Sequence, residues 1–206
     1  MKKTFLSFCV LSITLLNHAF AQEPFIRLGQ KALMGGDFNT AASYFEKAYT
    51  ENNSDMNALW FMGYAYYHAS EYRKCVYAFD KLINLKPSET VAYYYRGKAK
   101  TALYTGLTNI MAVEKEKLIK GAIKDFSTGV DISPNDLKFY QNRGLAYYDL
   151  ALFKNQKLPN VYNKAEAIAN VNLALKDYQK LMVYNNSRAD IQALIDKAKR
   201  FLVDVQ

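Results

Sequence analysis

Apolar positions recur along this chain with the period of an amphipathic helix, and they come in pairs of stripes. One stripe runs from Phe25 to Leu33 and the next from Ala41 to Ala48, with apolar side chains three or four residues apart. This spacing places the apolar side chains on one face of each helix. Gly35-Gly36-Asp37 separates the stripes and has the composition of a turn. The pattern therefore predicts a helix–turn–helix unit.

Three series of residues carry this unit along the chain in a common register. The glycines are Gly29, Gly63, Gly97 and Gly144, the small residues are Ala41, Cys75, Ala122 and Ala174, and the aromatics are Phe45, Phe79, Phe126 and Tyr178. Each aromatic follows its small residue by four positions, which is one helical turn. Each small residue precedes the next glycine by 22 positions, whereas a glycine precedes its own small residue by 12, 12, 25 and 30. Every repeat is thus a pair of helices, and the third and fourth carry extra residues between them.

The register divides the chain into four repeats and a closing helix. The repeats are predicted over residues 22–55, 56–89, 90–136 and 137–187, and an amphipathic helix over 188–206 covers the last of them. Pro87 and Pro134 end the second helices of their repeats. The extra residues fall at about 104–120 and 152–169, both on the same edge of the stack. Two interpretations stay open for them: extended solvated helices, or a shared docking edge.

These registers identify a family resemblance. Leu28-Gly29 and Phe45 in the first repeat, and Met62-Gly63 in the second, resemble the 34-residue tetratricopeptide repeat (TPR), with its Leu-Gly signature followed by a small residue and an aromatic. The resemblance implies an all-α fold, a right-handed solenoid of about four helix–turn–helix repeats plus a C-terminal capping helix. Arg96 and Arg143 depart from it, because they stand where the family usually has leucine.

The resemblance also implies a concave groove lined by the first helix of each pair, which binds a protein or peptide. The candidate groove residues are Trp60, Tyr64, Tyr67, His68, Tyr94, Lys98, Lys138, Gln141 and Tyr148. Tryptophan and tyrosine are enriched at binding hot spots. In the alternative interpretation these rings pack against neighbouring helices. The family's basic clamp for a terminal carboxylate is absent, because the matching positions hold Ile26, Gln30, Phe61, Val91 and Tyr95.

The N-terminus has the pattern of a secretory signal. Lys2 and Lys3 precede an apolar run over residues 5–16, and Ala19-Phe20-Ala21 supplies a cleavage site, so residues 1–21 are expected to be a signal peptide. The run is too short for a membrane span, although an uncleaved anchor is the alternative. Gln22 follows the cleavage site where a lipoprotein would have cysteine. We therefore expect a periplasmic or secreted protein that is not a lipoprotein and has no transmembrane span after cleavage.

The charge and the histidine and cysteine content of the chain argue against nucleic-acid binding and against a His/Cys metal site. The formal net charge is +8, or +6 without Lys2 and Lys3, and no basic run points to nucleic acid. His68 and Cys75 are the only histidine and cysteine after cleavage, which is too few for a His/Cys metal site. The carboxylates Asp125, Asp131 and Asp149 are interpreted as solvated or capping groups.

The sequence therefore predicts a non-enzymatic scaffold for protein–protein interaction that needs no cofactor. Two alternatives remain: a structural subunit of a cell-envelope assembly, in contact with other envelope subunits, or a carbohydrate- or peptidoglycan-binding module that stacks sugars on tyrosine and tryptophan.

Overall fold

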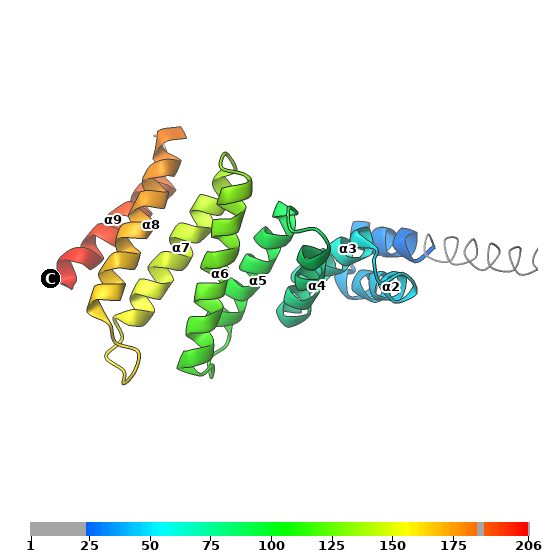
Figure 1. Cartoon of the computed structure of the whole chain (residues 1–206), viewed down its shortest axis with the longest axis horizontal. Coiled ribbons are helices and arrows are strands. Elements are labelled where there is room, and N and C mark those ends of the chain that lie inside the picture. Colours follow the sequence, from blue (N-terminus) through cyan, green and yellow to red (C-terminus); the bar gives the residue numbers. More distant parts are fainter. Residues whose placement is uncertain (1–23, 185–187, 206) are drawn as a thin grey trace, which may run out of the picture. The chain divides into compact units, whose positions relative to one another are not determined.

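A computed structural model describes residues 24–184 and 188–205, and the chain divides into two compact units between Pro87 and Ser88. The first unit contains a helix over residues 24–34, α2 (Phe38–Glu51), α3 (Met56–His68) and α4 (Tyr72–Leu85); the second contains α5 (Thr90–Gly106), α6 (Ala112–Ile132), α7 (Leu137–Lys154), α8 (Lys164–Tyr184) and α9 (Ala189–Asp204) (Figure 1). The described residues contain no strand, which confirms the all-α prediction. The expected signal peptide lies outside the described residues.

Successive helices pack on one another within each unit, in chain order. Helix α2 starts at the cap Asp37, whose carboxylate accepts a hydrogen bond from the Thr40 amide at 3.0 Å. Asp55 caps α3 in the same way. The turns before α2 and α4 need left-handed backbone, which Gly36 (φ +75°) and Ser70 (φ +62°) provide. Local capping and turn chemistry thus set where these helices begin.

The repeating glycines are explained by the aromatic ring of the same repeat. A Cβ atom would lie 2.5 Å from the Phe45 ring at Gly29, 2.7 Å from Phe79 at Gly63, 2.6 Å from Phe126 at Gly97 and 2.6 Å from Tyr178 at Gly144. All four rings are fully buried, and so are Ala41, Cys75, Ala122 and Ala174 one turn earlier. Burial raises the pKa of the Cys75 thiol, which keeps it protonated in the core. The register is therefore a packing rule in which a ring fills the space that the glycine leaves.

A methyl group added at Gly63 is expected to destabilise the first unit. Alanine improves helix propensity by about 1 kcal/mol, but overpacking costs about 1–3 kcal/mol, and the buried Phe79 ring cannot move into solvent. The net loss is at most about 2 kcal/mol. Urea unfolding followed by Trp60 fluorescence measures it, because Trp60 is the single tryptophan and lies on the same helix.

Gly106→Ala is the matched control for this substitution. Gly106 is the last residue of α5, and a Cβ there meets no atom within 4 Å. Its substitution should leave the stability of the second unit, followed by circular dichroism, unchanged or slightly higher. Equal losses in Gly63→Ala and Gly106→Ala would contradict the packing explanation for the glycine register.

The inserted residues mostly lengthen helices. Helix α5 runs to Gly106 and α6 starts at Ala112, while α7 runs to Lys154 and α8 starts at Lys164. Only residues 107–111 and 155–163 remain as connections. The structure thus agrees with the interpretation of extended helices.

A network of four charges holds these helix extensions together. The Lys154 ammonium lies 2.8 Å from Glu116 Oε1 of α6 and 3.3 Å from Glu166 Oε2 of α8. Lys120 bridges the same two carboxylates at 2.6 and 3.3 Å. The side chain of Lys154 is only 8% exposed, so screening by solvent is weaker here than for an ordinary surface pair. The network fixes α6, α7 and α8 at the inserted edge.

Candidate functional site

Helix α3 presents apolar side chains on two faces. Leu59, Met62 and Tyr66 are buried in the core of the first unit. Trp60 and Tyr64, four residues apart, lie half-buried on another face, and His68 follows one turn later and is exposed. We call Trp60, Tyr64 and His68 the aromatic ladder. None of the three ladder side chains belongs to the fully buried core of the first unit.

The three rings of the ladder contact one another along the helix. The Trp60 and Tyr64 rings stack with centroids 5.4 Å apart and an interplanar angle of 7°. The Tyr64 and His68 rings are 4.4 Å apart and tilted by 50°. Partial burial lowers the pKa of His68 below its usual 6.5, which favours the neutral imidazole near pH 7. The ladder at neutral pH is therefore a largely uncharged aromatic strip.

Further aromatic side chains contact the ladder at His68, one from α2 and one from α3 itself. Phe38 of α2 stacks on His68 at 5.0 Å. Tyr67 contacts His68 edge-on at 5.3 Å and Tyr72 of α4 at 5.8 Å. Contacts of this kind restrict ring rotation before any ligand arrives, and pre-organisation lowers the entropic cost of binding.

The other predicted groove residues lie in the second unit. Lys138 of α7 holds its ammonium 5.0 Å from the centroid of the Tyr94 ring of α5, a cation–π contact. Gln141 accepts a long hydrogen bond of 3.4 Å from Arg188, which precedes α9. Lys98 is half-buried on α5, one turn after Tyr94. The structure thus brings Tyr94 and Lys138 together, and the prediction of one continuous groove through both units stays a prediction.

Tyr148 is placed differently from the sequence interpretation. The repeat register predicts that Tyr148 faces the groove, but its side chain is 7% exposed and belongs to the core between α7, α8 and α9. Its ring contacts Phe201 of α9 at 6.1 Å, and the Lys197 ammonium lies 4.9 Å from its centroid. The closing helix covers this position, so Tyr148 packs in the core and does not face a ligand.

The interpretation of Asp125 as solvated or capping is also corrected. Asp125 is 1% exposed and accepts hydrogen bonds from Arg96, while the Lys100 ammonium lies 2.7 Å from its Oδ2. In the next repeat Arg143 binds Asp177, which is 3% exposed, through Nε at 2.8 Å and Nη2 at 2.7 Å.

These ion pairs explain why Arg96 and Arg143 occupy the position where the family usually has leucine. Each arginine directly precedes the repeat glycine, and each aspartate directly precedes the repeat aromatic. A changed residue in one helix is thus matched by a changed residue in the helix packed against it. The sequence pattern that indicates each pair is an arginine before the repeat glycine together with an aspartate before the repeat aromatic.

The described residues offer little for metal chemistry or for spanning a membrane. No group of three or more His, Cys, Asp or Glu side chains within residues 24–184 and 188–205 could hold a metal ion. Among the helices of the same ranges, none is long and apolar enough to cross a bilayer.

Comparison with solved structures identifies the fold. The chain is similar to TTC0263, a TPR protein of Thermus thermophilus (TM-score 0.52, 18% identity, covering 86% of this chain and 98% of that one), and to MamA of Desulfovibrio magneticus RS-1 (0.56, 20%, 89% and 96%). It is also similar to the first TPR of Spaghetti (RPAP3) bound to the HSP90 peptide SRMEEVD (0.54, 18%, 63% and 93%). No family model and no curated protein sequence matches the chain. The chain has the fold of the TPR proteins.

Proposed function

We propose that this protein is a non-enzymatic scaffold that binds a polypeptide segment, and that the aromatic ladder of α3 is the centre of its binding surface. The ladder itself carries the proposal. The Trp60 and Tyr64 rings stack on each other outside the fully buried core, and Phe38 stacks on His68, the third ring of the ladder. Rigid Trp and Tyr side chains bury a large area at low entropic cost, which is why they dominate binding hot spots.

The chemistry of the ladder indicates an apolar or aromatic segment as the ligand. The RPAP3 domain is similar in fold and is bound to the HSP90 peptide SRMEEVD, which is rich in acidic residues. This chain has Phe61 and Val91 among the positions where the family's clamp has basic or amide side chains. A neutral aromatic strip favours apolar side chains over a terminal carboxylate. The expected partner is therefore a different class of peptide.

Alanine at Trp60 or Tyr64 is expected to weaken peptide binding by about 30-fold, because a hot-spot side chain contributes about 2 kcal/mol or more. Peptides selected from a random display library against the purified protein serve as ligands. Fluorescence anisotropy of the labelled peptides measures each dissociation constant. Circular dichroism confirms that each variant is folded.

Tyr77→Ala is the control variant. Tyr77 is a 55% exposed tyrosine on α4, outside the ladder, with the Lys81 ammonium 5.4 Å from its ring centroid. Its loss should leave the dissociation constants unchanged. Selected peptides that bind Trp60→Ala and Tyr64→Ala as tightly as the native protein would overturn the ladder as the site. Trp60 fluorescence shifts with glycans but not with peptides would favour the carbohydrate alternative instead.

Export is part of the proposal. The basic start, the apolar run and the Ala19-Phe20-Ala21 site support cleavage after residue 21, which would place the ladder in the periplasm or outside the cell. The mass of the protein purified from a cell-envelope fraction tests this directly. An intact N-terminus would favour the uncleaved anchor.

A further inference from the structure

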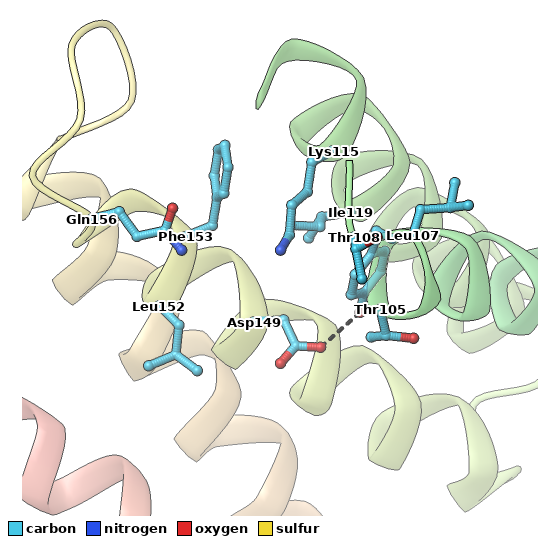
Figure 2. A pocket seen from close by; sticks show the side chains of 10 residues that line it. Thr105, Leu107, Thr108, Lys115, Ile119, Asp149, Leu152, Phe153 and Gln156 are labelled. Carbon is cyan, nitrogen blue, oxygen red and sulfur yellow. Dashed lines mark hydrogen bonds between the residues drawn. The ribbon is translucent and has the colours of Figure 1, made fainter. Parts of the chain in front are cut away.

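The second unit contains a cavity of about 420 Å³ where the inserted residues meet. Its walls come from the end of α5, the beginning of α6 and the end of α7 (Figure 2). This size lies in the range of sites for small molecules or single side chains. The charge network of Lys154 with Glu116 and Glu166 fixes two of these walls, the beginning of α6 and the end of α7, to each other. The cavity is thus a built feature of the insertions.

One wall of the cavity carries the carboxylate of Asp149. Its Oδ2 accepts a hydrogen bond of 2.8 Å from the Tyr104 hydroxyl (Figure 2). Within the described part of the chain Asp149 makes no ion pair, whereas the buried carboxylates Asp125 and Asp177 each bind an arginine. Burial raises the pKa of Asp149, and the Tyr104 hydrogen bond offsets this only in part. A carboxylate in this environment gains from a nearby positive charge.

The repeat does not require an acid at this place. Asp149 lies five residues after Gly144, and the corresponding residues after the other repeat glycines are Met34, His68 and Ala102. Ile119 and Phe153 supply apolar wall beside the carboxylate. The combination of an acidic group with apolar walls suits a cation on a short hydrocarbon stem.

Two lysines lie near Asp149, and neither forms an ion pair with it in the described structure. Lys115 of α6 lines the cavity and reaches toward α7 (Figure 2). Lys197 of α9 acts on Asp149 at longer range and lies over the Tyr148 ring. The Lys115 charge lowers the pKa of Asp149 and so offsets part of the effect of burial.

From this geometry we infer that the cavity binds an ammonium or guanidinium group on a short apolar stem, as in a lysine or arginine side chain, with Asp149 as its acceptor. This site is separate from the aromatic ladder, and the inference does not rest on the proposed function. Trp60→Ala, which tests the ladder, should leave binding at the cavity unchanged.

NMR titration of the purified protein tests the inference with N-acetyl-arginine N-methylamide and its lysine counterpart as probes. The citrulline compound has nearly the same shape as the arginine probe but no charge. We expect the cationic probes to shift the amide signals of Leu152, Phe153 and Gln156 in a saturable way, and the citrulline compound to leave them unchanged. Absence of binding by the cationic probes, or equal binding by citrulline, would overturn the inference.

Two variants separate charge recognition from folding. Asp149→Asn keeps an acceptor for Tyr104 and should weaken the cationic probes at least about tenfold, the loss expected for one hydrogen bond to a charged group. Asp131→Asn, at an exposed position of α6, is the control and should change nothing. Lys115→Met should strengthen binding, because a competing cation is removed. Unchanged affinity in Asp149→Asn, or weaker affinity in Lys115→Met, would contradict the assignment.

Butylguanidine distinguishes the source of the cation. If it binds as tightly as the capped arginine, the recognised group is a free organic cation. If the capped arginine binds about tenfold tighter, its backbone adds contacts, and the ligand is a polypeptide side chain. Either result retains the site, and binding of neither compound overturns it.

Discussion

Replacing Asp177 with alanine is expected to destabilise the second unit by about 3 kcal/mol. Removing one partner of a buried ion pair costs about 3–5 kcal/mol, because the other charge stays without compensation. The lower end applies here, since the Arg143 side chain retains 17% exposure and can recruit water. The hydrogen bonds that Arg143 donates to the Asp177 carboxylate also raise the pKa of Arg143, as expected for a paired guanidinium. Urea unfolding followed by circular dichroism measures the loss.

The second repeat provides the design of the control. At the positions of Arg143 and Asp177 it has Met62 and Ala78, both buried without charge. The double variant Arg143→Met/Asp177→Ala should recover most of the stability lost in Asp177→Ala, because apolar replacement of a whole buried pair is often neutral or favourable. A double variant as unstable as the single one would show that the unpaired arginine is not the cause.

The repeating part of the fold could be predicted because one packing rule fixes several residues together. Gly63 leaves space that the Phe79 ring fills from the adjacent helix, and the same packing recurs in every repeat. Spacing alone reveals such a rule, since both members lie at constant distance along the sequence. The all-α fold follows from this register.

Features that depend on departures from the rule were harder to predict. Tyr148 has a groove position by register, but α9 covers it, and periodicity does not tell which surface a closing helix buries. Asp149 resembles an ordinary polar residue until the lengthened ends of α5, α6 and α7 enclose it. The length of an insertion predicts neither the cavity nor its lining. Both depend on which helix ends the inserted residues bring together in space.

Tyr178→Phe is expected to stabilise the second unit by about 1–3 kcal/mol. The Tyr178 side chain is fully buried, and its hydroxyl has no hydrogen-bond partner among the described residues. A buried polar group without a partner loses its hydration with no compensation, at a cost of that size. The other three repeats place phenylalanine here (Phe45, Phe79 and Phe126), so the ring alone satisfies the packing rule. Thermal unfolding by circular dichroism should show a melting temperature several degrees higher.

Removing the hydroxyl group of Tyr104 should have the opposite effect on the stability of the second unit. Tyr104 is also buried, but its hydroxyl donates to the Asp149 carboxylate at 2.8 Å. Tyr104→Phe removes a hydrogen bond to a charged group and should cost about 1.5–3 kcal/mol. Both variants remove a tyrosine hydroxyl from the same unit. Any effect of this removal on the unfolded chain is therefore common to both, and it cancels when their stabilities are compared. Destabilisation by both variants would show that the Tyr178 hydroxyl is hydrogen-bonded in solution, for example to a buried water molecule. The fourth repeat would then need a polar group at this position.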